Sequence, residues 1–202
     1  MIRYFLVLIT TFLSYNALAS YQITNSEFNM LPPHCQAVYA EMYQRGKTSG
    51  LVIKPMKYHP EIWKRRIGSA WTFMNHYCPG LVGLNNAKVS PNGRAIQLEH
   101  AGENIKYQIT HAKWTPSNSW LLAEAHAKLA EVAELRGQPG EAIRNYEEAI
   151  KAYPKSYRIY LNYSKLLAKG GNREQALKVV REGLKQVPKS KTLKRQEKRL
   201  MK

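Results

Sequence analysis

The sequence predicts an all-α protein in which helical-hairpin repeats form a short α-solenoid, preceded by a disulfide-stapled helical N-terminal region. Three observations lead to this prediction. A pattern in the C-terminal half recurs at a fixed period, since Gly137 recurs as Gly171, 34 positions later. Apolar residues within each copy follow helical spacing, and a glycine or proline stands where each expected helix should end. A period of this length is typical of proteins that stack pairs of helices.

Residues 1–19 have the features of a secretory signal peptide. Arg3 supplies positive charge, residues 5–13 form a short apolar run, and Ala17 and Ala19 are the small residues that a signal peptidase reads. We therefore expect cleavage after Ala19 and export, in a bacterium, to the periplasm. An uncleaved membrane anchor is the alternative, but the apolar run is much shorter than the ~20 residues that span a bilayer.

The charge composition is strongly basic. The chain has 31 Lys and Arg against 14 acidic residues, a formal net charge of +17, which loss of Arg3 with the leader would lower to +16. All 14 acidic residues are Glu, and Asp is absent. Ser/His/Asp triads, Asp-rich calcium loops and Asp-based phosphoryl-transfer sites therefore lack a constituent. We expect a protein that is not an enzyme and holds no cofactor.

The two cysteines stand close to histidines: His34 directly precedes Cys35, and His76 lies two positions before Cys78. Two His and two Cys are also the ligands of a tetrahedral zinc site, so the spacing leaves a metal site, a reactive thiol and a disulfide open. An exported chain is in an oxidising compartment, which favours a Cys35–Cys78 disulfide and no metal. Such a disulfide would stabilise the fold by about 4 kcal/mol for a loop of this length. A metal site and free reactive thiols remain as alternatives.

The two histidines themselves have two interpretations. His34 and His76 can flank the bridge and hydrogen-bond helix ends. Alternatively, they form with the nearby Trp63, Trp71 and Tyr77 a small polar and aromatic surface that recognises a partner.

Residues 20–116 are expected to be the helical region around the disulfide. One helix can begin at Pro33, and Pro60 can occupy the first turn of a second helix. Cys35 would then lie in the first turn of one helix and Cys78 in the last turn of the next. A bridge between them would cross-link two helices.

The end of this region has the pattern of a degenerate hairpin. Residues 93–116 carry apolar residues at mostly helical spacing and end in a proline. Their partner would be the stretch 70–89, which we expect to be interrupted at Pro79 and Gly80 because proline breaks a helix.

Residues 117–188 contain two copies of one helical hairpin. In each copy a glycine ends the first helix, and small residues let the second helix approach closely. Asn172 is expected to cap the second helix of the second copy, with Gln175 as its capping-box partner. The markers recur in pairs: Gly137 and Gly171, Ala142 and Ala176, Tyr146 and Val180, Ala149 and Gly183, Pro154 and Pro188.

These residues resemble the tetratricopeptide repeat family over residues 123–188. The resemblance implies a scaffold for protein interaction, in which the first helix of each hairpin lines a peptide-binding groove. In this sequence the implied lining is acidic in the first copy and mostly basic in the second, which favours a peptide of mixed charge. The implied groove residues are Glu124, Glu131, Glu134, Arg158, Asn162, Lys165 and Lys169.

Residues 189–202 are expected to form a basic capping helix or tail, because two repeats alone leave apolar surface uncovered. Residues 185–202 hold eight Lys or Arg and one Glu. We expect an exported adaptor that binds a partner protein and helps to assemble an envelope complex. The alternative is a module that binds anionic membrane lipid, lipopolysaccharide or cell-wall polymer through this tail. The pattern does not favour nucleic acid as a partner, because no phosphate loop or nucleic-acid-binding motif accompanies the charge.

Overall fold

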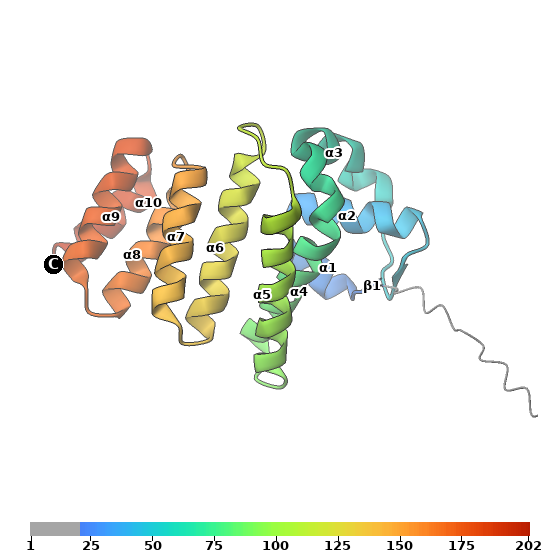
Figure 1. The fold of residues 1–202 in the computed structure, drawn as a ribbon, viewed down its shortest axis with the longest axis horizontal. Coiled ribbons are helices and arrows are strands. Elements are labelled where there is room, and N and C mark those ends of the chain that lie inside the picture. The colour runs from blue at the N-terminus through green and yellow to red at the C-terminus, as the bar shows by residue number, and fades with distance from the viewer. Residues whose placement is uncertain (1–20) are drawn as a thin grey trace, which may run out of the picture.

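The computed structural model describes residues 21–202, which fold into a row of α-helices running from the N-terminal region to the C-terminal helix (Figure 1). The predicted leader, residues 1–19, lies outside the described residues. The all-α prediction is confirmed, and the described chain adds one pair of two-residue parallel strands, β1 (Tyr21–Gln22) and β2 (Thr48–Ser49). None of the described helices combines the length and the apolar composition that crossing a membrane requires.

The helices have the following bounds. In the N-terminal region they are α1 (Asn25–Met30), α2 (Pro33–Gln44), the 3-10 helix η1 (Pro55–Tyr58), α3 (Pro60–Ile67) and the 3-10 helix η2 (Gly68–Phe73). These are followed by α4 (Met74–Val89), α5 (Arg94–His111), α6 (Ser119–Leu135), α7 (Pro139–Ala152), α8 (Tyr157–Lys169), α9 (Arg173–Gln186) and α10 (Lys191–Leu200).

The first described helices begin at residues with clear start signals. The Thr24 side chain accepts a hydrogen bond from the N–H of Glu27, whose carboxylate accepts from the N–H of Thr24, so α1 starts with a capping box. α2 begins at Pro33 and α3 at Pro60, as predicted. The helix that starts at Pro60 was predicted to reach Cys78, but α3 ends at Ile67. Its C-cap is Gly68, whose φ of 64° lies in the left-handed region that favours glycine.

α4 and α5 pack along each other as a helical hairpin (Figure 1). The predicted interruption at Pro79 is wrong, because α4 is continuous through this residue. Pro79 lies in the second turn, where it removes one backbone hydrogen bond, and tight packing of the following turn keeps the helix in place. A Cβ on Gly80 would come within 2.9 Å of Ile105 Cγ1, and one on Gly83 within 3.2 Å of the Gln97 carbonyl oxygen. Only glycine allows α5 to lie this close.

α6 to α9 form two stacked hairpins, which confirms the predicted helical-hairpin repeats, and α10 packs against α8 and α9. The Asn172 side chain accepts a hydrogen bond from the N–H of Gln175, so Asn172 caps α9 as predicted. The small residue predicted at position 183 is required by its neighbour. A Cβ on Gly183 would lie 2.6 Å from Tyr160 Cγ, far inside van der Waals contact.

Two clusters of buried apolar side chains share α6. One cluster lies among the N-terminal helices, α4 and α5, and α6 contributes Leu121 and Val132 to it. The other lies among the repeats and α10, and Ala123 and Ala130 of α6 belong to it. Because one helix has a face in each cluster, the N-terminal region and the repeats are packed continuously.

Candidate functional site

The predicted disulfide is present and joins α2 to α4. Cys35 and Cys78 are both fully buried, with their Cα atoms 5.4 Å apart. Cys78 lies in the second turn of α4, not in the last turn of a helix that starts at Pro60, because that helix ends at Gly68. The two sulfurs are bonded to each other, so neither is a thiolate nucleophile or ligand. Within residues 21–202, no group of three or more His, Cys, Asp or Glu side chains is placed to hold a metal ion.

His34 is buried near the disulfide and contacts the first repeat. Its Nε2 lies 3.3 Å from Glu124 Oε1, and its side chain is 4% exposed. Three aromatic rings surround the imidazole, with centroids 5.7 Å away for Trp63, 6.1 Å for Tyr77 and 5.5 Å for Trp120. His34 therefore joins α2 to α6, a role different from the predicted one at a helix end.

Glu124, whose side chain is 29% exposed, is the centre of this polar cluster. The Tyr77 hydroxyl donates a hydrogen bond to Glu124 Oε1 at 2.8 Å. Burial favours the protonated carboxyl, but His34, the Tyr77 hydroxyl and the charge of Lys128 outweigh it and hold the pKa of Glu124 below its ordinary value. Burial and the neighbouring negative charge of Glu124 raise the pKa of Tyr77 well above its ordinary value. Glu124 is thus an ionised group that already has interaction partners within the protein.

The predicted polar and aromatic surface is not a single surface. The Trp71 indole N–H donates to Glu41 Oε2 at 2.8 Å, beside α2. His76, on α4, packs against Tyr107 of α5 with ring centroids 4.1 Å apart. His76 and the buried His34 therefore belong to different environments.

A hollow of about 500 Å³ opens among α4, α6 and α8, the first helices of three successive hairpins. The turn between α1 and α2 closes one side of it. We call this hollow the α4–α6–α8 groove. It is lined by Met30, Leu31 and Pro32 of that turn, by Leu81 and Asn85 of α4, by Trp120, Glu124, Ala127, Lys128 and Glu131 of α6, and by Tyr153, Ser156, Arg158, Ile159 and Asn162 before and on α8.

The residues that the resemblance assigned to one peptide groove line three different hollows in the structure. Glu134 and Lys169 line a second hollow between the two repeats, and Lys165 lines a third with Lys169, beside α10. Glu134 also accepts a hydrogen bond from the Tyr146 hydroxyl at 2.6 Å. The basic and polar positions of α8 follow one stripe of the helix, and this stripe runs from the groove to the side of α10. Of the predicted groove residues, Glu124, Glu131, Arg158 and Asn162 line the α4–α6–α8 groove itself.

The second carboxylate of the groove, that of Glu131, is paired with two lysines. One oxygen of Glu131 lies 2.8 Å from Lys128 Nζ, and the other pairs with Lys88. Burial opposes ionisation, but these two lysines hold the pKa of Glu131 below its ordinary value. Arg158, by contrast, is exposed and has no carboxylate partner among residues 21–202. Among the predicted residues that line this groove, Arg158 is therefore the charged one that has no ion-pair partner within the described residues.

Part of the groove comes from residues that no sequence pattern marked. Leu31, Leu81 and Asn85 lie outside the repeats, and only the fold of the N-terminal region brings them to α6. Trp120 precedes the segment of family resemblance, residues 123–188, and its indole Nε1 is buried without a hydrogen-bond partner in the described structure. In the sequence, the one signal that could have indicated this part of the groove is the bulky aromatic residue at the start of α6.

Residues 133–196 match the family model described as tetratricopeptide repeat. The match runs from the end of α6 into α10 and supports the predicted resemblance for that part of the chain. Tetratricopeptide repeats are modules for protein–protein interaction. No curated protein matches the chain.

Proposed function

We propose that this protein is an exported, non-enzymatic adaptor that holds a segment of a partner protein in the α4–α6–α8 groove. This proposal rests on the properties of the groove. The groove lies on the first helices of stacked hairpins, combines apolar surface with hydrogen-bonding groups, and has carboxylates that already have partners within the protein. The tetratricopeptide match supports a protein partner.

The lining indicates what kind of segment fits. The exposed Met30 and the partly buried Trp120 offer apolar contact, while the side-chain amides of Asn85 and Asn162 can hydrogen-bond a peptide backbone. Arg158 adds the one positive charge of the lining that has no carboxylate partner within the described chain. A partner segment that carries both an apolar side chain and a carboxylate matches this arrangement.

Export is part of the proposal. Residues 1–19 have the composition of a cleaved leader, and a buried disulfide suits a protein that works in an oxidising compartment. The adaptor would then act in the bacterial periplasm, in the assembly or maintenance of an envelope complex.

In-cell photo-crosslinking tests the groove. A photo-reactive amino acid is placed at Asn162, inside the groove, or at Arg144, an exposed position on α7 that does not line it. We expect the Asn162 variant to give a reproducible crosslinked protein from the envelope fraction, and the Arg144 variant to give none. The absence of a reproducible partner at Asn162, or the same partner at both positions, would overturn the proposal.

A charge reversal at the groove gives an independent readout once that partner is purified. Arg158→Glu should lower the affinity at least about tenfold, equivalent to ~1.4 kcal/mol, because it replaces the free positive charge of the groove with a negative one. The matched Arg144→Glu variant makes the same change in net charge and should leave the affinity unchanged. Equal losses in both variants would indicate a dependence on net charge alone.

A further inference from the structure

We propose that a basic surface formed by α8 and α10 binds the phosphate groups of an anionic lipid surface. It is separate from the α4–α6–α8 groove, and the proposal does not depend on what that groove binds. The surface surrounds a hollow of about 380 Å³. We call it the α8–α10 hollow, and it is lined by Lys165, Ala168, Lys169, Gln196, Arg199 and Leu200.

Packing holds α10 in one orientation. The Ser190 side chain accepts a hydrogen bond from the N–H of Leu193 and so caps the start of the helix. Leu193 and Leu200 are buried in the cluster that α10 shares with the repeats. With this side buried, Arg195 and Arg199, four positions apart, lie on one exposed stripe of the helix.

The hollow has three cationic groups and no carboxylate in its lining. Lys165 and Lys169 lie one turn apart on α8, and Arg199 lines the hollow from α10. None of the three has a carboxylate partner within residues 21–202. The one acidic residue of α10, Glu197, is paired with Arg181 of α9. The positive charge of the hollow is therefore uncompensated.

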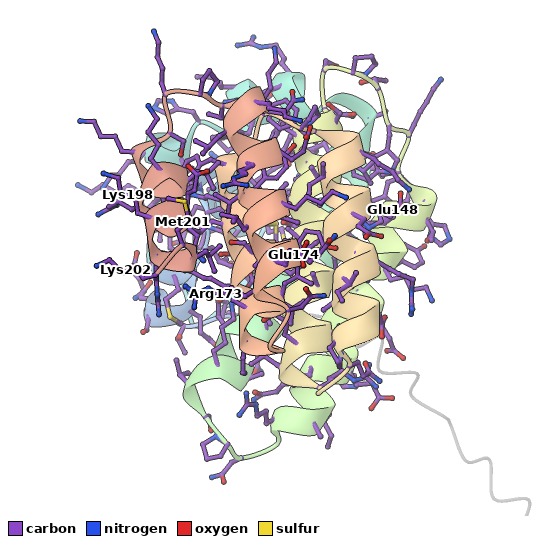
Figure 2. All side chains as sticks on the ribbon, turned by 90° about the vertical axis from the view of Figure 1, so that its left-hand side faces the viewer. Glu148, Arg173, Glu174, Lys198, Met201 and Lys202 are labelled. Atoms are coloured by element: carbon purple, nitrogen blue, oxygen red, sulfur yellow. A yellow bond between two sulfur atoms is a disulfide. The ribbon has the colours of Figure 1, made fainter. Side chains whose placement is uncertain are left out.

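The positive charge extends along α10 beyond the hollow. Lys191, Lys194 and Lys198 are exposed and have no carboxylate partner in the described chain. Lys198 and Lys202 lie at one edge of this end of the protein, whereas Glu148 lies toward the opposite edge (Figure 2). Charges spread over a whole helix match a plane that carries many anionic groups better than they match one small anion.

The chemistry of the lining favours lipid phosphate over other polyanions. Guanidinium and ammonium groups bind phosphate oxygens through charge-assisted hydrogen bonds. Proteins that bind single-stranded nucleic acid add aromatic side chains on which bases stack, and no aromatic residue lines the hollow. An acidic peptide would use pockets for its side chains, but Ala168 and Leu200 are the only apolar residues of the lining. The predicted leader would also deliver the chain to a compartment bounded by lipid surfaces.

Vesicle co-sedimentation of the exported protein tests the inference. The vesicles contain phosphatidylcholine alone or phosphatidylcholine mixed with phosphatidylglycerol. The test variant carries Lys165→Gln, Lys169→Gln and Arg199→Gln. The control variant carries Arg94→Gln, Lys106→Gln and Lys113→Gln, which remove the same charge from exposed positions on and after α5. Circular dichroism and thermal melting check that both variants are folded.

We expect the wild type to bind only the vesicles that contain phosphatidylglycerol. The test variant should lose on the order of a hundredfold in partition coefficient, because each base near an anionic lipid surface contributes to binding, while the control variant should stay within about twofold of the wild type. Equal losses in both variants, or no binding by the wild type, would overturn the inference. So would displacement from the vesicles by inorganic phosphate at matched ionic strength, or tighter binding to oligoglutamate or single-stranded DNA at the same salt.

Discussion

His34 Nε2 and Glu124 Oε1 lie 3.3 Å apart, although 90 positions separate the two residues in the chain. The contact joins α2, which carries the disulfide, to α6, which starts the repeats. Glu124 also lines the α4–α6–α8 groove, so the N-terminal region is a structural part of the candidate site. The N-terminal region holds one wall of the groove in place.

Glu124→Gln should lower the free energy of unfolding by about 1–3 kcal/mol at neutral pH, because it removes the charged partner of the buried His34 and of the Tyr77 hydroxyl. Urea denaturation followed by circular dichroism measures this difference. Glu148→Gln is the matched control, since Glu148 is exposed and pairs only with Lys151 at the surface. We expect its denaturation midpoint to equal that of the wild type.

The effect of Glu124→Gln should also depend on pH. The pKa of this carboxyl is lowered in the folded protein, so its stabilisation is complete above its ordinary pKa of 4.5 and is lost as pH falls through the lower folded value. The difference between the wild type and the variant should therefore be constant above pH 4.5 and shrink in more acidic solution. A difference that does not change with pH would show that the carboxylate charge does not stabilise the fold.

Replacing both cysteines, as Cys35→Ala with Cys78→Ala, should lower the free energy of unfolding by about 2–5 kcal/mol, because the bridge no longer restricts the unfolded chain. Urea denaturation of the variant and of the reduced wild type should give similar midpoints. In the exported wild type, thiol titration under denaturing, non-reducing conditions should find no free thiol. Two titratable thiols would contradict the disulfide and return the metal site to consideration.

Gly183→Ala should destabilise the protein by about 1–3 kcal/mol, because the added methyl group would overlap the Tyr160 ring. Gly140→Ala is the matched control. Its Cβ would have only the end of the Arg144 side chain within 4 Å, at 3.9 Å, and alanine favours a helix over glycine. Thermal melting should therefore show a lower Tm for the first variant and an unchanged or higher Tm for the second. Equal shifts would indicate that the packing of α9 on α8 adapts to the extra methyl group.

We predict that the protein reaches the periplasm without its leader and begins there at Ser20, because Ala17 and Ala19 form the predicted cleavage signal. Intact-mass measurement determines this terminus directly. A variant with Ala17→Leu and Ala19→Leu should keep the leader, since large side chains block the peptidase. A wild-type mass that includes residues 1–19 would contradict cleavage.

The parts of the fold that were predicted correctly follow from local patterns. Asn172 caps α9, Pro33 and Pro60 begin helices, and the repeated glycines mark the ends of the first helices, because each of these effects acts within one turn of the chain. The break expected at Pro79 was wrong for a related reason. The packing of Gly80 and the following turn against α5 outweighed the local preference of proline. The sequence near Pro79 contains no pattern that predicts this packing.

The candidate groove was predicted only in part. Arg158 and Asn162 lie on the repeat pattern and were placed in the groove, whereas Leu81 and Asn85 were missed because they come from a hairpin with no repeat pattern. Lys165 was predicted to line the same groove. In the structure α10 packs against α8, and Lys165 lines the α8–α10 hollow instead.

Periodicity and helix-start signals are local properties, and they were enough to define the class of fold and the resemblance of its C-terminal part. Which charges remain free is a property of three-dimensional packing. Glu131 looks like an available acid in the sequence, yet Lys88, 43 positions away, pairs with it, and Glu124 lies against His34 and the Tyr77 hydroxyl. Coulomb interactions depend on distance in space, so only the packed structure shows that the unpaired charge of the groove and of the α8–α10 hollow is positive.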